Sequence, residues 1–132
     1  MGEKRDLRKQ CKEKRKRLGR EYITNASRRI TDSFLLSNAY REAQTIFIYA
    51  STLYEVDTRG AIAAMLAEDK TVCVPVVCRD REMMPICLTS LAELKLNKYA
   101  IPEPAFAPEK EVPALQIELC VTPMLCAAET GY

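Results

Sequence analysis

The sequence of 132 residues contains no histidine and no long run of apolar residues. Histidine is the commonest zinc ligand and the base of Ser-His and Cys-His pairs, so its absence excludes hydrolases that depend on such a pair. A membrane helix needs about 20 consecutive apolar residues, and a signal peptide needs an apolar stretch where this N-terminus is charged. We therefore expect a cytoplasmic protein with no membrane partner.

The cysteines lack the Cys-x-x-Cys spacing of many metal and redox sites, although there are six of them. Three fall in apolar, strand-like runs, which favours reduced core residues over disulfides. The six are Cys11, Cys73, Cys78, Cys87, Cys120 and Cys126. A composition that is 48% hydrophobic and 29% charged is that of an ordinary globular protein. The length suits a single domain, which we expect to span residues 1–132.

Positive charge is concentrated at the N-terminus, where residues 1–20 hold ten Lys or Arg and three acidic residues, whereas the rest of the chain is net acidic. Such a segment is typical of proteins that bind a polyanion, whether nucleotide phosphates, nucleic acid or a membrane surface. Lys4 and Arg8 are one helical turn apart, and this pair suits a polyphosphate. Dense basic residues also form solvated faces that bind nothing, so the pattern alone leaves both interpretations open.

The apolar pattern predicts strands at Thr45–Ser51 and Thr71–Val77, joined by a helix over residues 59–68. A strand–helix–strand unit makes its two strands parallel and places the chain in the α/β class. Another main strand is predicted within residues 115–123 and a weaker one over residues 84–88. We therefore expect a mainly parallel central sheet.

Two helices are predicted before the first strand. The first is a basic surface helix over residues 3–18, which Gly19 ends. The second covers residues 21–36, and its apolar residues repeat at the helical period, so it can cover a sheet. Ser90 is predicted to cap a short helical stretch, and the proline-rich residues 102–113 to form an extended surface loop.

Two carboxylates, Glu55 and Asp57, follow the first strand. In open α/β sheets ligands bind outside the carboxyl ends of the strands, so both residues lie where a site is expected. Asp57 has a structural explanation as the N-cap of the next helix. Glu55 has no such explanation, although an ordinary solvated loop carboxylate is an equally good interpretation of its position.

Four short segments carry a resemblance to a known family. They are Lys4-Arg5-Asp6-Leu7-Arg8, Ser51–Thr58, Val74-Pro75-Val76 and Tyr99-Ala100-Ile101-Pro102-Glu103-Pro104. In this order and spacing they resemble the 5-formyltetrahydrofolate cyclo-ligases, also called methenyltetrahydrofolate synthetases. The resemblance covers nearly all of the chain. It implies a three-layer α/β sandwich, with a mainly parallel central sheet and helices on both faces.

The resemblance also implies an activity, the ATP- and magnesium-dependent closure of 5-formyltetrahydrofolate to 5,10-methenyltetrahydrofolate, with release of ADP and phosphate. In that family ATP is thought to phosphorylate the formyl oxygen, and a folate nitrogen then displaces the phosphate. Positioning and charge neutralisation supply most of the acceleration in such phosphoryl transfers. The partners expected from the resemblance are therefore a reduced folate and ATP, bound by a monomer.

By matching positions, the resemblance assigns Lys4 and Arg8 to the ATP phosphates and Glu55 to the folate, where a carboxylate would accept from ring N–H groups. It places Met83 and Tyr99 in the folate pocket, with Tyr99 offering a flat face for stacking. Ordinary loop packing is the alternative for both of these residues. No catalytic residue and no metal ligand is assigned.

The sequence departs from the family near its end. The family continues with an Arg-x-Gly-x-Gly-x-Gly-Tyr-Tyr-Asp signature, which supplies a phosphate nest and a magnesium-binding carboxylate, and the printed sequence holds no such segment. Upstream, where the family has Pro-Gly-Leu-Ala-Phe-Asp, residues 123–128 read Pro-Met-Leu-Cys-Ala-Ala. We therefore expect a C-terminally truncated member with an incomplete sheet and weakened Mg-ATP binding.

Two other functions remain open from the sequence. One is a protein that binds folate without turnover. The other is a nucleic-acid binder that works through the basic helix, for which affinity would fall steeply with salt, and no aromatic or motif context supports this reading.

Overall fold

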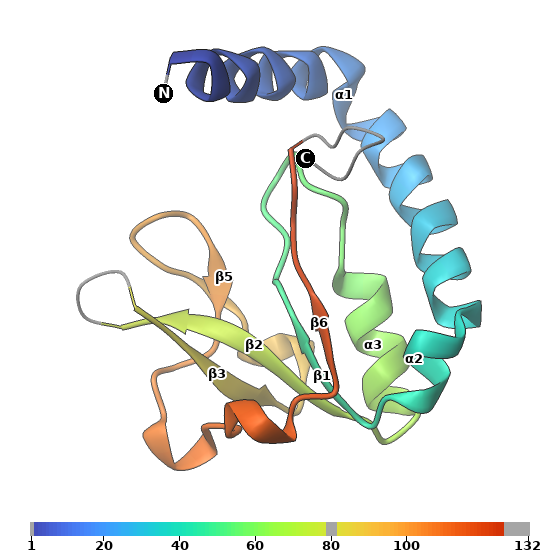
Figure 1. The fold of residues 1–132 in the computed structure, drawn as a ribbon, viewed down its shortest axis with the longest axis vertical. Helices are drawn as coiled ribbons and strands as arrows, with labels where there is room; N and C mark the ends of the chain where they lie inside the picture. The colour runs from blue at the N-terminus through green and yellow to red at the C-terminus, as the bar shows by residue number, and fades with distance from the viewer. Residues whose placement is uncertain (1, 79–81, 126–132) are drawn as a thin grey trace.

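Three α-helices and a central sheet form the protein in the computed structural model, which describes residues 2–78 and 82–125 (Figure 1). The helices are α1 (Gly2–Leu36), α2 (Asn38–Glu42) and α3 (Arg59–Ala67). None of the helices in these residues is both long and apolar enough to cross a membrane.

The sheet has four strands in the order β3-β2-β1-β6. They are β1 (Thr45–Ile48), β2 (Thr71–Val77), β3 (Met83–Leu88) and β6 (Leu119–Val121). Strand β1 pairs in parallel with both β2 and β6, while β3 runs antiparallel to β2. The predicted α/β class and mainly parallel sheet are therefore confirmed, and β1-α3-β2 is the predicted strand–helix–strand unit.

The core lies between the helices and one face of the sheet. The inward residues of β1 and β2 alternate along each strand, as a pleated strand requires, and Ile46, Ile48, Val72 and Val74 are at most 1% exposed. Ile62 of α3, 0% exposed, packs against them. The other buried members of this cluster are Tyr40, Ala43, Ala61, Met65 and Leu88. The described residues form no helical layer on the opposite face, so that part of the expected sandwich stays a prediction.

Helix α1 consists of two straight parts that meet at Gly19. The backbone of Gly19 has φ 83° and ψ 163°, a combination that essentially only glycine adopts. The predicted end of the basic helix at Gly19 is thus confirmed. Figure 1 shows that the second part packs beside α3, whereas residues 2–18 turn away and lie across the end of the sheet toward which β6 runs.

The segment between β3 and β6 is more ordered than the predicted surface loop. Strands β4 (Lys95–Leu96) and β5 (Pro102–Glu103) form an antiparallel pair, and Val112 is only 7% exposed. The prediction of an extended surface loop was therefore wrong at both ends of residues 102–113. The short 3₁₀ helices are Leu91–Glu93, Pro108–Lys110 and Ala114–Gln116. Ser90 caps the first of them, as predicted, by accepting from the Ala92 N–H.

The predicted lengths of two strands were too great. Strand β1 ends at Ile48 rather than Ser51, because the chain then folds back into a hydrogen-bonded loop. Strand β6 occupies only Leu119–Val121, because a 3₁₀ turn precedes it. Helix α2 was not predicted, since five residues are too few to show a helical period.

Cys73, Cys78, Cys87 and Cys120 are reduced thiols, as predicted. Cys11 lies half-buried on α1, and Cys126 lies outside the described residues. Among the first four, Cys73 alone is fully buried, and burial raises the pKa of its thiol to about 12. The expectation of core cysteines therefore holds for Cys73, which faces Cys87 on the neighbouring strand.

The kink at Gly19 gives a stability prediction. In Gly19→Ala the new side chain disfavours the bent backbone by about 1–3 kcal/mol, so we expect residues 2–18 to leave the sheet end, with faster amide hydrogen exchange in that segment and unchanged exchange in β1 and β2. Gly60→Ala is the matched control, because a β-carbon there meets no atom within 4 Å and the backbone is helical. We expect this control to stabilise the protein by up to about 1 kcal/mol. Similar exchange in the two variants would contradict the role of Gly19.

Candidate functional site

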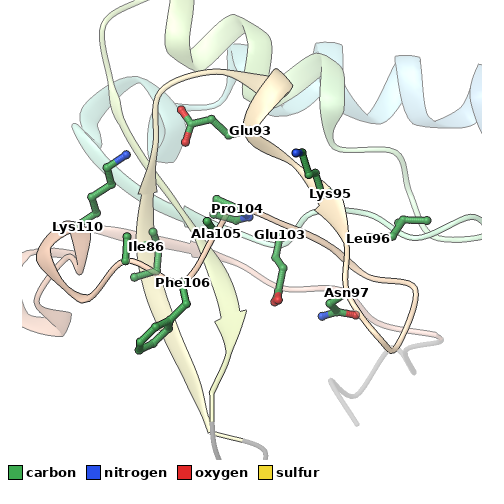
Figure 2. Close-up of a pocket in the computed structure, with 11 residues that line it drawn as sticks. Ile86, Glu93, Lys95, Leu96, Asn97, Glu103, Pro104, Ala105, Phe106 and Lys110 are labelled. Atoms are coloured by element: carbon green, nitrogen blue, oxygen red, sulfur yellow. The ribbon is translucent and has the colours of Figure 1, made fainter.

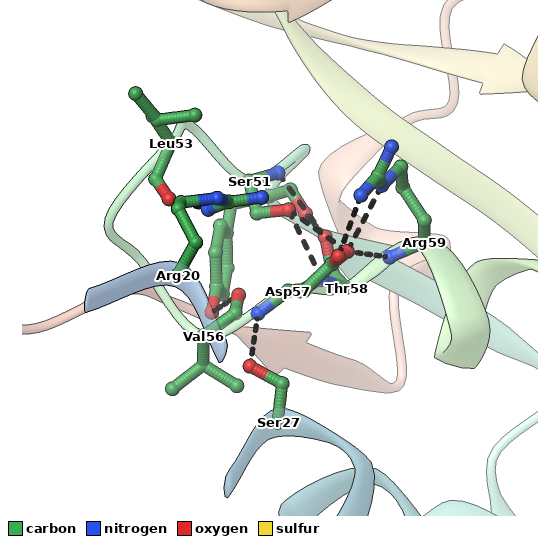
Figure 3. Close-up of polar contacts among 9 residues, drawn as sticks. Arg20, Ser27, Ser51, Leu53, Val56, Asp57, Thr58 and Arg59 are labelled. Carbon is green, nitrogen blue, oxygen red and sulfur yellow. Dashed lines mark hydrogen bonds and ion pairs between the residues drawn. The ribbon is translucent and has the colours of Figure 1, made fainter. Parts of the chain in front are cut away.

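Hydrogen bonds from its own hydroxyl groups stabilise the loop that follows β1. Thr58, 4% exposed, donates its hydroxyl to the Tyr49 carbonyl at 2.8 Å and accepts from the Ser51 N–H at 3.1 Å. In return the Ser51 hydroxyl oxygen accepts from the Thr58 N–H at 3.1 Å. These bonds tie the start of the loop to its end (Figure 3), so the residues between them are held at the carboxyl end of β1.

Asp57 stabilises the start of α3, although the N-cap itself is Thr58. The carboxylate of Asp57 accepts from the Arg59 N–H at 2.9 Å and forms a 2.7 Å ion pair with the Arg59 guanidinium. The hydrogen bond from Arg59 lowers the pKa of Asp57. The backbone N–H of Asp57 donates to the hydroxyl of Ser27 in α1 at 2.8 Å. Asp57 thus accepts a hydrogen bond at the start of α3, as predicted, but it lies one residue before the N-cap. The N-cap residue, Thr58, makes no capping bond of its own because its hydroxyl donates to the Tyr49 carbonyl.

Glu55 is oriented by its own loop and keeps one oxygen available. Its Oε1 accepts from both the N–H and the hydroxyl of Thr52, each at 2.8 Å. Its Oε2 has no hydrogen-bond partner within residues 2–78 and 82–125. A carboxylate fixed through one oxygen presents the other to a ligand at little entropic cost.

Two arginines, one on each side of Gly19, hold α1 against this loop. Arg15 donates to the carbonyl of Tyr54 at 3.3 Å and to that of Leu125 at 3.0 Å, and it also contacts the Met124 carbonyl. Arg20 donates to the carbonyl of Leu53, as Figure 3 shows. Because these acceptors are backbone carbonyls from two strand-end segments, the arginines fix the position of the helix without using acidic side chains.

Tyr99 is presented by the turn between β4 and β5. The side-chain oxygen of Asn97 accepts from the N–H groups of Tyr99, at 2.8 Å, and Ile101, at 3.1 Å. Ala100 takes a left-handed conformation with φ 60°, which closes the turn. The Lys98 ammonium lies 5.2 Å from the centre of the Tyr99 ring, and Tyr99 itself is 56% exposed. The turn thus holds an aromatic ring at the surface.

These three segments line an open cavity of about 460 Å³, which we call the strand-end cavity. It is lined by Lys12, Arg15, Lys16, Thr52, Leu53, Tyr54, Glu55, Tyr99, Ala100 and Leu125. The structure therefore brings together Glu55 and Tyr99, two of the five residues that the sequence selected. A smaller cavity of about 270 Å³ is also lined by Arg15 and Glu55.

Tyr49 lies beside the same charges. Burial, followed by the negative charge of Glu55, raises the pKa of Tyr49 to about 12, while the positive charge of Arg15 opposes the rise. The phenol is therefore neutral at ordinary pH and donates to the Val56 carbonyl at 2.9 Å. Tyr49 acts as a support for the loop that carries Glu55.

The other sequence-selected residues do not line the strand-end cavity. Met83 is the first residue of β3 and is 64% exposed. Lys4 and Arg8 lie nearer the N-terminus of α1. At about 100° per helical residue, Lys4, Arg8 and Arg15 project within about 40° of one another, so Lys4 and Arg8 share the face that docks on the loop but lie farther along the axis.

Sequence reasoning missed Lys12, Arg15 and Lys16, the cations that do line the strand-end cavity. A signal for them was present, because Lys12 and Lys16 continue the four-residue spacing of Lys4 and Arg8. Nothing in the sequence showed which turn of the basic helix would meet the loop. That depends on the kink at Gly19.

A third hollow, of about 470 Å³, lies beside β4 and β5. Figure 2 shows Glu93 and Lys110 at one end of it and Asn97 at the other. Its carboxylates already have structural partners, because Glu103 accepts from the Val77 N–H at 2.9 Å and Glu93 from the Thr89 N–H at 3.0 Å. Within the part of the chain that the structure describes, no three His, Cys, Asp or Glu side chains are placed to hold a metal ion.

Comparisons with known proteins agree with this architecture. A profile of the 5-formyltetrahydrofolate cyclo-ligase family matches residues 1–132, whereas no curated protein sequence matches. Among solved structures, the NMR structure of Aquifex aeolicus 5,10-methenyltetrahydrofolate synthetase is similar, with a TM-score of 0.74 and 21% identity. That match covers 89% of this chain and 58% of the other, so this chain spans little more than half the length of its structural relative. The match over residues 1–132 shows that the chain belongs to the 5-formyltetrahydrofolate cyclo-ligase family.

Proposed function

We propose that this chain takes part in the ATP-dependent cyclisation of 5-formyltetrahydrofolate to 5,10-methenyltetrahydrofolate, with release of ADP and phosphate. The observation that carries the proposal is the strand-end cavity, which places an oriented carboxylate and an aromatic ring in one lining at the carboxyl end of β1. This is the position where open α/β sheets bind ligands. The family match supports the choice of substrate.

In this proposal Glu55 and Tyr99 bind the folate. The Oε1 atom of Glu55 is held by Thr52, so its Oε2 atom is available to accept from the amino and ring N–H groups of the pterin. Tyr99 stacks on the flat ring system, and its exposed position leaves one face open to a ligand. Both contacts fix the orientation of the formyl group rather than react with it.

Lys4 and Arg8 bind ATP phosphates in this proposal. They project on the same side of α1 as Arg15, which faces the folate loop, so a nucleotide held by them lies alongside the strand-end cavity. Positioning the γ-phosphate next to the formyl oxygen is the main task of a site for phosphoryl transfer. Among the described residues, no three His, Cys, Asp or Glu side chains are grouped as metal ligands, and we therefore derive no step through magnesium and assign no catalytic residue.

Folate binding without turnover is the second candidate. It is favoured by the contrast between the two halves of the site, because the folate residues Glu55 and Tyr99 line the strand-end cavity whereas Lys4 and Arg8 line none of the cavities described above. In either case we propose a monomer that acts in the cytoplasm.

Turnover separates the two candidates. We expect the purified chain, mixed with 5-formyltetrahydrofolate, magnesium and ATP, to produce an ATP-dependent rise in the absorbance of methenyltetrahydrofolate. Calorimetric binding of the folate with no such rise would leave the binding protein as the function. Absence of both signals in a folded sample would contradict both candidates.

Glu55→Gln tests the folate contact. The amide keeps an oxygen for Thr52 but places an NH₂ group against the pterin donors, and loss of a charged hydrogen bond costs about 1.5–3 kcal/mol. We therefore expect affinity for 5-formyltetrahydrofolate to fall at least tenfold in calorimetry. Glu42→Gln is the matched control, since Glu42 is exposed at the end of α2 and lines none of these cavities. Equal affinities of the two variants would rule out Glu55 as a ligand contact.

Tyr99 variants test stacking. Tyr99→Phe retains the ring, so we expect unchanged folate affinity, whereas Tyr99→Ala removes a contact worth about 0.5–1.5 kcal/mol and should weaken binding roughly two- to tenfold. The role of Met83 stays a prediction, and Met83→Ala belongs in the same titration series. A weakened Phe variant would show that the hydroxyl, and not the ring, makes the contact.

A further inference from the structure

We propose that Lys12 and Lys16 form an anion subsite of the strand-end cavity, and that this subsite takes the carboxylate tail of the folate. The inference rests on the proposed function and deepens it, because it assigns the end of the substrate that Glu55 and Tyr99 do not hold. The chemistry recognised is a carboxylate or a phosphate, and the experiment below separates the two.

The position of the two lysines is set by their neighbour. Arg15 lies between them in the sequence, and its guanidinium donates hydrogen bonds to the carbonyls of Tyr54 and Leu125. This anchor holds the adjacent helical turns over the loop. Lys12 and Lys16, four residues apart, therefore project from one side of the helix into the same lining.

Both lysines are available for a ligand. They are exposed, and neither has an ion-pair partner in residues 2–78 and 82–125, where the ion pair found joins Arg59 and Asp57. Because Arg15 and Arg20 dock the helix through neutral carbonyls, the lysine charges are not needed to hold it in place. A lysine ammonium on a flexible stem can then follow a mobile anion.

The lining of the strand-end cavity is positively charged on the side of α1 and negatively charged at the β1 loop. Three cations come from α1, and Glu55 is the single acidic residue in the lining. A ligand that is anionic throughout is repelled at Glu55, and a cation is repelled at the helix. The matching ligand has hydrogen-bond donors at one end, an anion at the other and a flat portion for Tyr99.

A reduced folate has this distribution of groups. Its pterin carries amino and N–H donors, its aminobenzoyl group is flat, and its glutamate carries two carboxylates. The volume of about 460 Å³ lies within the range of about 300–1,000 Å³ that small-molecule sites occupy. With the pterin at Glu55, the carboxylates are left for Lys12 and Lys16.

The test compares three ligands on two charge-matched double variants. The first variant combines Lys12→Gln with Lys16→Gln. The control combines Lys14→Gln with Arg17→Gln, which removes the same charge from the same helix on the side about 150° away. The ligands are 5-formyltetrahydrofolate, 5-formyl-6-methyltetrahydropterin, which lacks the tail, and ATP, which is the phosphate probe.

We expect the first variant to bind 5-formyltetrahydrofolate about five- to tenfold more weakly, as the loss of two partly exposed ion pairs implies. Its affinity for the tetrahydropterin should equal that of the unmodified chain. The control variant should bind all three ligands as the unmodified chain does. The affinity difference between the folate and the tetrahydropterin should also shrink as salt is raised.

Three results would overturn the inference alone. If the first variant loses affinity for ATP but not for 5-formyltetrahydrofolate, the subsite belongs to the nucleotide phosphates. If the control variant weakens binding equally, the effect is general charge and not a site. If Glu55→Gln still weakens folate binding but the first variant does not, the tail assignment fails while the proposed function stands. Failure of the unmodified chain to bind either the folate or the tetrahydropterin would overturn the proposed function and this inference together.

Discussion

The central position of β1 is the constraint on which the site depends. This strand is hydrogen-bonded in parallel to β2 on one side and to β6 on the other, so its carboxyl end opens at the same edge of the sheet as theirs. At its amino end the Glu118 carboxylate accepts from the N–H groups of Gln44, at 2.9 Å, and Thr45, at 3.0 Å, and so aligns β6 with β1. With both edges of β1 paired, the loop that carries Glu55 has one direction in which to leave the sheet.

The second determinant is the way in which a very basic helix is attached to that edge. Guanidinium groups bonded to carbonyls need no acidic counterpart, and one Arg15 fork reaches carbonyls that are 39 and 110 residues away in the sequence. Carbonyl acceptors also make the attachment less dependent on salt than ion pairs are. The side chains of Lys12 and Lys16 in this basic segment are therefore not needed for its attachment and remain available to bind an anion.

The sequence indicated the elements whose signals are local. Runs of β-branched residues marked β1 and β2, helical spacing marked α3, and the rule that sites lie beyond strand ends selected Glu55. The failures came from contacts between different segments, which no pattern within a single segment shows. Asp57 was expected as the N-cap, but Thr58 takes that position while its hydroxyl serves Tyr49 of the preceding strand. Prolines suggested a free loop, although Pro102–Glu103 pairs with Lys95–Leu96. The choice of Lys12 and Lys16 over Lys4 and Arg8 as cavity residues followed from a docking angle, which no local pattern contains.

The separation of α1 at Gly19 has a consequence for how tightly the site can bind. Residues 2–18 bury little apolar area, with Leu7 at 45% and Leu18 at 43% exposure, so this segment is a local folding unit of low stability compared with the core. Any ligand that spans the segment and the β1 loop binds only the attached population, and its apparent affinity is reduced by the fraction that is detached. Conversely, such a ligand lowers the population of detached helices. The apparent affinity of the site therefore depends on the equilibrium between attached and detached forms of residues 2–18.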